Sequence, residues 1–133
     1  MFGEYKRLTA SQVPLVRSRL ASEQGGKCAI CGGAFGTKAP HDPVLDHDHA
    51  TGAVRGVLHR GCNSGLGVVE NGAKRFGFMS RIIQFCMGLG AYLRKHEENV
   101  TGYIHPTHRT DEEKRLLRNK RARIARAKKK EQA

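Results

Sequence analysis

The stretch LDHDHATGAVRGVLHRGCN, residues 45–63, decides the fold of this chain. Two short runs of strand-forming residues, 44–49 and 54–58, flank an Ala-Thr-Gly turn and predict a β-hairpin. The HRGCNSGLG that follows predicts entry into a short helix. Side chains alternate along a strand, so Asp46 and His47 are expected on opposite faces. We therefore expect a small α+β fold in which a hairpin leads directly into a helix.

Helical segments are predicted on both sides of this hairpin. Upstream, Ser11 is a candidate N-cap for a helix that ends at Gly25-Gly26. Downstream, Asn71-Gly72 predicts a turn, and an amphipathic helix is expected over about 78–96. Cys86 lies in that helix and is expected to be a small buried hydrophobe. The upstream stripe is Val13, Val16 and Leu20, and the downstream one, a core face or subunit interface, is Phe78, Ile82, Phe85, Leu89 and Leu93.

Composition indicates a small basic protein with a lean core. The 133 residues suit one domain plus a tail, with 38% hydrophobic residues, 6% aromatic residues and no Trp. A core this small usually needs additional stabilisation.

The net charge of +12 indicates a polyanionic partner, with an acidic membrane surface as the other candidate. No apolar run is long enough to span a membrane, and the N-terminus lacks the apolar core of a secretion signal, so an intracellular protein is expected.

The positive charge is concentrated in a C-terminal tail. Residues 109–133 hold 11 Lys or Arg and 4 acidic residues, which gives +7 of the total +12. We expect a basic helix that becomes ordered on a phosphate backbone; a merely solvated tail is the alternative. Arg55 and Arg60, near the hairpin, could clamp phosphates in two-bond contacts or remain solvated. The tail residues expected to bind DNA are Lys114, Arg115, Arg118, Lys120, Arg121, Arg123, Arg126, Lys128, Lys129 and Lys130.

Two pairs of residues have the spacing of a zinc site. Cys28-x2-Cys31 and His59-x2-Cys62 are separated by 27 residues, and each pair can place two ligands on one tetrahedral zinc ion. Four protein ligands close the coordination sphere, so this zinc is expected to be structural and to supply roughly 10–16 kcal/mol of folding free energy. A redox pair of Cys28 and Cys31 lacks its usual strand–helix context. Other candidates for the histidine ligand are His41, His47 and His49.

If zinc takes those four residues, part of the DHDH sequence remains for chemistry. Asn63 follows a zinc ligand at a helix start and is expected opposite the strand end that carries Asp46 and His47. Carboxylate and amide oxygens are hard ligands suited to Mg²⁺. An imidazole beside such an ion can take a proton from water, as phosphodiester hydrolysis requires. A polar strand end without chemistry is the alternative interpretation.

The two motifs together resemble a known family. CAICGG (28–33) with LDHDHATGAVRGVLHRGCNSGLG (45–67) is similar to the recombination endonuclease VII family, a zinc-containing branch of the His-Me finger (ββα-metal, HNH-like) nucleases. The similarity extends over residues 8 to about 96. It implies a ββα-metal hairpin and helix held together by a structural zinc, flanked by helices and followed by a basic tail.

The resemblance also implies roles for individual residues. Asp46 and Asn63 would hold one Mg²⁺ or Mn²⁺ ion. His47 would activate the attacking water, and His49 would contact the scissile phosphate. The family likeness further implies phage origin, action in the cytoplasm of the host cell, and cleavage of branched DNA such as Holliday junctions by an intertwined dimer. A nicking or homing-type endonuclease on duplex DNA and a non-catalytic zinc module that binds DNA are the alternatives.

The chain departs from the family pattern at two positions. Many members have Cys where this chain has His59, which keeps a zinc ligand but changes its charge. Some members have a glutamate three residues after the Asn, where this chain has Leu66. Glu70 is a candidate to replace that carboxylate.

The expected organisation has four parts. Residues 1–26 form an N-terminal helical lead-in, and residues 27–72 form the zinc-stabilised nuclease core. Residues 73–98 form the amphipathic helix, and residues 99–133 form a linker and the basic DNA-binding tail.

Overall fold

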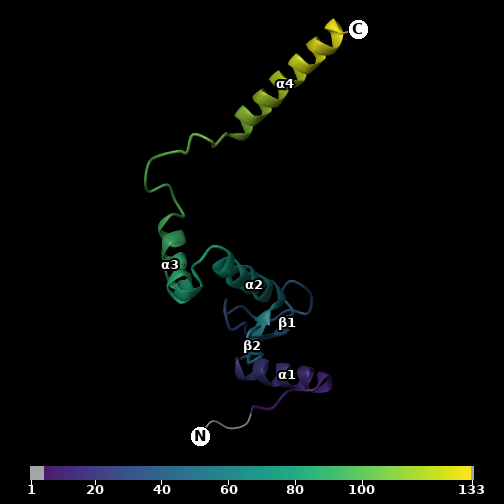
Figure 1. The fold of residues 1–133 in the computed structure, drawn as a ribbon, viewed down its shortest axis with the longest axis vertical. Helices are drawn as coiled ribbons and strands as arrows, with labels where there is room; N and C mark the ends of the chain where they lie inside the picture. The colour runs from purple at the N-terminus through teal and green to yellow at the C-terminus, as the bar shows by residue number, and fades with distance from the viewer. Residues whose placement is uncertain (1–4, 133) are drawn as a thin grey trace. The chain divides into compact units, whose positions relative to one another are not determined.

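The computed structural model describes residues 5–132, and the chain divides between Cys86 and Met87 into two units. The 3₁₀ turns, helices and strands are η1 (Ala10–Gln12), α1 (Val13–Glu23), β1 (Pro43–His47), β2 (Val54–His59), α2 (Arg60–Arg75), η2 (Met79–Arg81), α3 (Ile82–Lys95) and α4 (Asp111–Glu131) (Figure 1). Within residues 5–132, no helix is long and apolar enough to cross a membrane. The helices together with a two-stranded sheet confirm the predicted α+β class.

The hairpin forms as predicted, but its first strand is shorter. β1 stops at His47, and His49 lies in the connecting turn. The Asp48 carboxylate causes this, because it accepts hydrogen bonds from the backbone N–H groups of Ala50 and Thr51 at 2.8 and 2.9 Å. A side chain that binds the backbone two and three residues onward bends the chain out of the strand. The alternation expected through His49 therefore ends at His47.

A β-bulge interrupts the pairing of the two strands. Asp46 lies opposite Gly56 and His47 lies opposite Val54, so Arg55 is an extra residue in β2. Residues paired across a regular ladder point to the same face, and without the bulge Arg55 would pair with His47. The extra residue shifts the side-chain direction by one position. Arg55 is therefore directed toward Asp46.

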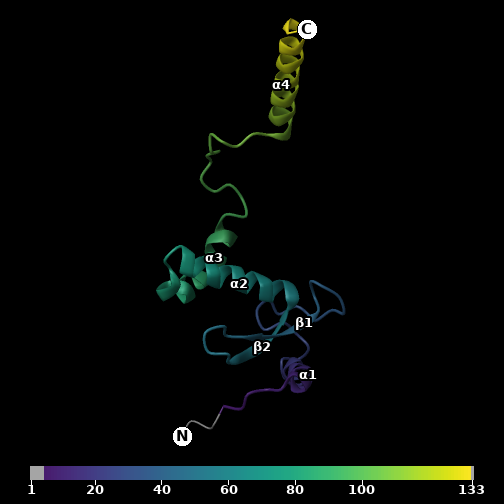
Figure 2. The ribbon, with the colours of Figure 1, turned by 45° about the vertical axis from the view of Figure 1, so that its right-hand side comes forward.

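The hairpin lies between two helices. α1 packs against both strands from one side and α2 packs against them from the other (Figures 1 and 2). Because both faces of β2 are covered, Val57 and Leu58 are both buried although they are neighbours in sequence. Among the described residues, the only other buried apolar side chains are Cys28 and Ala73. The core is therefore small, as the composition indicates.

The side chain of Gln24 ties the end of α1 to β2. Its amide oxygen accepts from the Val57 N–H at 2.9 Å, and its amide nitrogen donates to the Val57 carbonyl at 2.9 Å. The same nitrogen donates to the carbonyl of Lys27 at 2.9 Å. A Cβ atom on Gly56 would lie 3.2 Å from the Gln24 amide oxygen, so glycine leaves room for this contact. Gln24 thus pairs with β2 as a neighbouring strand would.

The start of the first helix differs from the prediction. Ser11 lies inside η1, and the capping residue is Thr9, whose N–H donates to the Gln12 side chain at 2.9 Å. Gln12 reaches back across three residues to form this capping box, and that explains why the N-cap precedes Ser11. The predicted stripe of Val13, Val16 and Leu20 is half-buried.

The second helix is longer than predicted. Asn71-Gly72 lies within α2, so the turn expected there is wrong. Ala73 is fully buried against the hairpin, and packing of this kind outweighs the weak helix propensity of Asn and Gly. α2 instead ends at Arg75, before Gly77, whose φ of 75° marks the true turn.

The predicted amphipathic segment is η2 followed by α3. The rings of Phe78 and Phe85 lie 4.4 Å apart. Most of the apolar side chains of α3 within residues 5–132 are exposed, however. Cys86 is exposed as well, and its expected burial is therefore wrong. An exposed apolar helix face is available for a contact between molecules.

The basic tail contains the predicted helix, α4. Its N-terminus has a capping box in which the Thr110 hydroxyl accepts from the Glu113 N–H, and Glu113 accepts from the Thr110 N–H. Acidic residues fill the first turn and basic residues fill the last. Both charge placements oppose the helix dipole and stabilise the helix.

Candidate metal centre and active site

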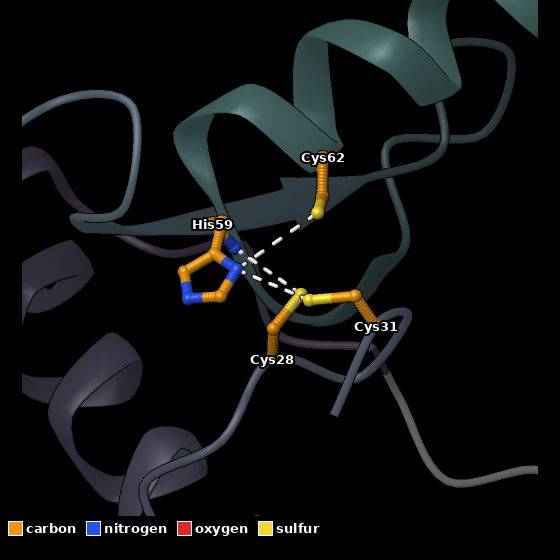
Figure 3. Close-up of side chains that lie close together, drawn as sticks. All are labelled: Cys28, Cys31, His59 and Cys62. Carbon is orange, nitrogen blue, oxygen red and sulfur yellow. Dashed lines mark hydrogen bonds between the residues drawn. The ribbon is translucent and has the colours of Figure 1, made fainter. Parts of the chain in front are cut away.

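Four potential zinc ligands converge where β2 joins α2 (Figure 3). Cys28 and Cys31 come from the loop after α1, His59 ends β2, and Cys62 lies in the first turn of α2. Their ligand atoms all lie within 4.8 Å of one another. Nδ1 of His59 lies 3.2 Å from the Cys31 sulfur and 3.9 Å from the Cys62 sulfur. These distances bracket the ~3.6 Å expected between nitrogen and sulfur ligands on a tetrahedral zinc ion. The fold thus brings together the predicted set, which is suited to a structural zinc.

The orientation of the His59 ring selects one nitrogen for a metal. Nε2 lies 2.9 Å from the carbonyl oxygen of Ala34. A carbonyl oxygen can only accept a hydrogen bond, so Nε2 carries the hydrogen. The Nδ1 lone pair is then left facing the sulfur atoms, and a fixed tautomer of this kind is usual for metal-bound histidine. The ring of His41 packs edge-on against His59, with centroids 5.6 Å apart, and does not enter the cluster. His47 and His49 lie at the turn end of the hairpin, away from its base.

The two glycines after Cys31 are required by the loop geometry. Gly32 has a φ of 71°, a left-handed conformation that side chains disfavour, and its N–H donates to the Cys28 carbonyl at 2.9 Å. A Cβ atom on Gly33 would lie 3.2 Å from Cε1 of His59. The CxxCGG sequence is therefore a turn whose glycines let the cysteines meet the histidine.

The protein environment favours a thiolate at one cysteine. Burial by itself raises the pKa of the Cys28 thiol. Hydrogen bonds from the backbone N–H groups of Cys31, His59 and Ile30 outweigh burial and lower the pKa to about 6. Burial, together with the neighbouring Cys31 and Cys28 sulfurs, raises the pKa of Cys62 to about 11. Because neighbouring sulfurs oppose ionisation of Cys62, a thiolate at this residue needs a cation in the cluster.

A second polar cluster lies near the turn end of the hairpin, around Asp46. Its side chain is 8% exposed, and both carboxylate oxygens accept from Arg55, at 2.7 Å from Nε and 3.1 Å from Nη2. The third nitrogen of the same guanidinium, Nη1, donates to Glu70 of α2 at 2.6 Å. Hydrogen bonds donated to these two carboxylates raise the pKa of Arg55 above its ordinary value. Arg55 therefore joins the hairpin to α2 through two carboxylates.

The two histidines of the DHDH sequence come from the same end of the hairpin. His47 and His49 are exposed, and their ring centroids are 4.9 Å apart. Asn63 is half-buried in the first turn of α2, which packs against both strands. Among residues 5–132, the hydrogen bonds that join Asp46, Arg55 and Glu70 do not include the Asn63 side chain. The structure thus pairs the two histidines and adds Arg55 and Glu70 to the predicted set.

The remaining predicted DNA-binding residues fall into two groups. Arg60 forms a two-bond contact with Asp42 at the base of the hairpin, its shortest distance being 2.7 Å. On α4, Lys114 and Arg115 pair with Asp111 and Glu112. In the part of the chain that the structure describes, the other basic side chains of α4 are in no ion pair and are exposed: Arg118, Lys120, Arg121, Arg123, Arg126, Lys128, Lys129 and Lys130.

A hairpin that leads directly into a helix, with a zinc-type ligand cluster at the junction, places the protein in the ββα class of small α+β folds. Residues 5–88 match the model of the recombination endonuclease VII family, and the chain belongs to that family. This confirms the resemblance read from the two motifs. The family assignment implies a DNA endonuclease whose partner is DNA. No curated protein matches the chain significantly.

Arg55 and its link to Glu70 were only partly anticipated from the sequence. Arg55 was expected either to clamp phosphates or to be solvated, and Glu70 was a candidate replacement for the carboxylate missing at Leu66. Their pairing depends on the bulge between Asp46 and His47, which has no sequence signature in this hairpin. The spacing of Asn63, Leu66 and Glu70, at i, i+3 and i+7, is the signal that places Glu70 on the Asn63 face of α2.

Proposed function

We propose that the protein is a divalent-metal-dependent endonuclease that cuts branched DNA. The observation that carries the proposal is the arrangement at the end of β1, in a chain of the endonuclease VII family. There, the buried Asp46 is followed in sequence by the exposed His47, whose ring lies near that of His49. A buried acid and accessible imidazoles at one end of the hairpin provide an anion to bind a cation and a base to accept a proton.

The residues present fit a hard divalent cation such as Mg²⁺ or Mn²⁺. The Asp46 carboxylate is already matched to a positive group, because both of its oxygens accept from the Arg55 guanidinium. The Asn63 amide, in the first turn of α2, is the second proposed ligand; oxygen ligands of these two kinds suit Mg²⁺. When bound, the ion would act as a Lewis acid at the scissile phosphate. Asp46 and Asn63 would hold it between the hairpin and α2.

The histidines supply the proton chemistry in this proposal. His47, exposed at the end of β1, would accept a proton from the attacking water. His49, in the turn, would donate a hydrogen bond to a phosphate oxygen and orient the scissile group. The short distance between their rings, 4.9 Å between centroids, allows both to act on one phosphodiester.

We propose that the protein binds DNA mainly through contacts with the phosphate backbone of the DNA. The α4 helix is ~31 Å long at 1.5 Å per residue, so its basic side chains can follow the phosphates of most of one helical turn of DNA. Contacts of this kind position a protein without reading base sequence, which suits recognition of a junction by its shape. The tail would therefore raise affinity for any DNA.

Paired cuts across a junction need two active sites, and we propose that a homodimer supplies them. α3 offers an apolar face on which Phe85, Leu89 and Leu93 are exposed. Burying this face between two copies would remove apolar surface from water and match the approximate twofold symmetry of a four-way junction.

The proposal is tested by cleavage of four substrates, each with and without Mg²⁺: a four-way junction, a three-way junction, a mismatched duplex and a linear duplex. We expect Mg²⁺-dependent, paired cuts in the branched substrates and little cleavage of linear duplex. Single nicks in linear duplex would instead support a nicking or homing-type endonuclease. Retardation of all four substrates without any cleavage would support a non-catalytic DNA-binding module.

A further inference from the structure

The strongest unexplained contact is the one between Arg55 and the proposed cation ligand. Arg55 places two of its nitrogens on the Asp46 carboxylate and its third on Glu70. A guanidinium bound to both oxygens of a carboxylate uses a lone pair on each, and its positive charge repels a metal ion that approaches the same group. The positive charge expected of a divalent cation is therefore already provided by the protein itself.

The contact is built into the fold. The bulge between Asp46 and His47 makes Arg55 the extra residue of β2 and turns it toward Asp46. Arg60, in contrast, pairs only with Asp42 among the residues that the structure describes, and its side chain is 56% exposed against 33% for Arg55. Arg60 therefore provides a matched arginine–carboxylate pair that does not touch Asp46.

We propose that Arg55 competes with the divalent cation for Asp46, and that DNA relieves this competition by drawing the guanidinium onto a phosphate. This inference rests on the proposed function, because it assumes that Asp46 is a ligand of the ion. Arg55 is a positioning residue: it keeps Asp46 and Glu70 compensated in the DNA-free protein. In the DNA complex it releases Asp46 to the ion.

When Arg55 exchanges Asp46 for a phosphate, each charged group keeps an oppositely charged partner. Phosphate, like carboxylate, accepts two parallel hydrogen bonds from a guanidinium, so Arg55 can trade one anion for the other. The divalent cation then replaces the charge removed from Asp46. The Arg55 side chain is one-third exposed, which leaves it accessible to a strand of DNA. Binding of ion and of DNA must then strengthen each other equally, because coupling between two sites is reciprocal.

Glu70 is proposed to hold the Arg55 guanidinium in place. Its bond to Nη1 at 2.6 Å anchors the guanidinium on the side opposite Asp46. If Glu70 serves as this anchor, removing its charge loosens Arg55 and makes Asp46 more available to the ion. If Glu70 were instead a ligand that replaces the carboxylate missing at Leu66, removing its charge would weaken ion binding.

The test measures Mn²⁺ affinity of the zinc-loaded, DNA-free protein by electron paramagnetic resonance. We expect Arg55→Gln to bind Mn²⁺ at least about five-fold more tightly than wild type, the lower end of ordinary coupling between sites. Glu70→Gln should bind Mn²⁺ as tightly as wild type or more so. Arg60→Gln, the matched control, should leave Mn²⁺ affinity unchanged, and Asp46→Asn should abolish tight binding.

The outcomes separate this inference from the proposed function. If Asp46→Asn abolishes Mn²⁺ binding but Arg55→Gln binds no more tightly than wild type, competition by Arg55 is ruled out and the metal site stands. If Asp46→Asn binds Mn²⁺ as wild type does, Asp46 is not a ligand, and both the metal site and the inference fail. Weaker binding by Glu70→Gln would make Glu70 a ligand and overturn its role as anchor.

A second measurement covers the case in which Arg55→Gln does not fold, as zinc content and melting would reveal. Arg55→Lys retains the charge but cannot bond both carboxylates in the same planar fork, so its Mn²⁺ affinity should exceed that of wild type. In a His47→Ala background, which slows cleavage by roughly 10²–10⁴-fold, a four-way junction should raise Mn²⁺ affinity at least about five-fold. That gain should shrink when Arg55→Lys is added. An equal gain with and without Arg55→Lys would contradict the exchange.

Discussion

Nε2 of His59 lies 2.9 Å from the carbonyl oxygen of Ala34, on the far side of the ring from the cysteine sulfurs. This contact fixes the ring so that Nδ1 faces the cluster. It also means that His59 stabilises the loop in two ways, as a candidate ligand and as a hydrogen-bond donor. The two contributions can be separated by substitution.

Removing a cysteine ligand should abolish folding, whereas replacing the histidine by cysteine should not. Cys28→Ser and Cys62→Ser each remove one of four ligands, and the folding free energy that depends on zinc, roughly 10–16 kcal/mol, exceeds the stability of a domain this small. Wild-type protein should contain about one equivalent of zinc by elemental analysis. Cys86→Ser, an exposed cysteine outside the cluster, is the control and should retain zinc. Less than half an equivalent in well-folded wild type would refute a structural zinc.

His59→Cys should bind zinc yet melt at a lower temperature. A fourth thiolate can hold the ion, but it cannot donate to the Ala34 carbonyl. The lost hydrogen bond should cost about 1 kcal/mol, which lowers the melting temperature by roughly 4–8 °C in a domain of this size. Differential scanning calorimetry of zinc-loaded protein measures this shift. An unchanged melting temperature would show that the Ala34 contact contributes nothing.

Zinc should be retained at neutral pH and lost in acid. Each cysteine must be a thiolate to bind zinc, so protons compete with the ion. The pKa of Cys28, lowered to about 6 from 9.0, sets the pH below which that competition begins at this residue. The raised pKa of Cys62, about 11, means that zinc must displace its proton even at neutral pH, so affinity rises with pH. Zinc remaining after exposure to a chelator should be high at about pH 8 and low at about pH 5; equal retention would contradict this.

His47→Ala should separate chemistry from folding. The variant should keep its zinc, melting temperature and DNA affinity, because the His47 side chain is exposed. Its cleavage rate should fall by roughly 10²–10⁴-fold, the usual contribution of a general base. His96→Ala, a histidine outside the hairpin, should cut normally. Cleavage by His47→Ala at near wild-type speed would show that another group accepts the proton.

The basic tail should supply affinity without catalysis. Deleting residues 110–133 removes the α4 cations, so fewer counterions are released when DNA binds. Affinity should fall to a similar degree for every DNA sequence, and the dependence of log K on log salt should become flatter. Replacing Lys128, Lys129 and Lys130 by Gln should give an intermediate slope. A deletion variant with the wild-type slope would show that α4 makes no phosphate contacts.

The exposed face of α3 should hold the proposed dimer together. Leu89→Asp places a charge on the apolar stripe, whereas Gln84→Asp, on the opposite face of the same helix, is the matched control. Sedimentation at micromolar concentration should give roughly twice the 14.7 kDa chain mass for wild type and for Gln84→Asp. Leu89→Asp should sediment as a monomer. A monomeric wild type would remove the basis for paired cuts.

The sequence predicts the parts of this site that depend on spacing along the chain. The two x2 pairs identify the four clustered ligands, and the Ala-Thr-Gly turn identifies the hairpin. The direction of Arg55 could not be predicted, because it depends on how two strands pair and on a bulge between them. The turn predicted at Asn71-Gly72 and the burial predicted for Cys86 are wrong for a related reason. The burial of Ala73 and the exposure of α3 depend on packing, which local propensity does not predict.

The pairing of Gln24 with Val57 has a consequence beyond holding α1 in place. A two-stranded sheet leaves the outer edge of each strand open, and open edges can recruit strands from other molecules. At Val57 of β2, that edge is occupied by the Gln24 amide and by the N–H of Ala29, which donates to the Val57 carbonyl at 3.2 Å. Ala29 belongs to the loop that carries Cys28 and Cys31. Zinc loss would free this loop and uncover the edge, so the metal-free protein is prone to intermolecular sheet formation as well as to unfolding.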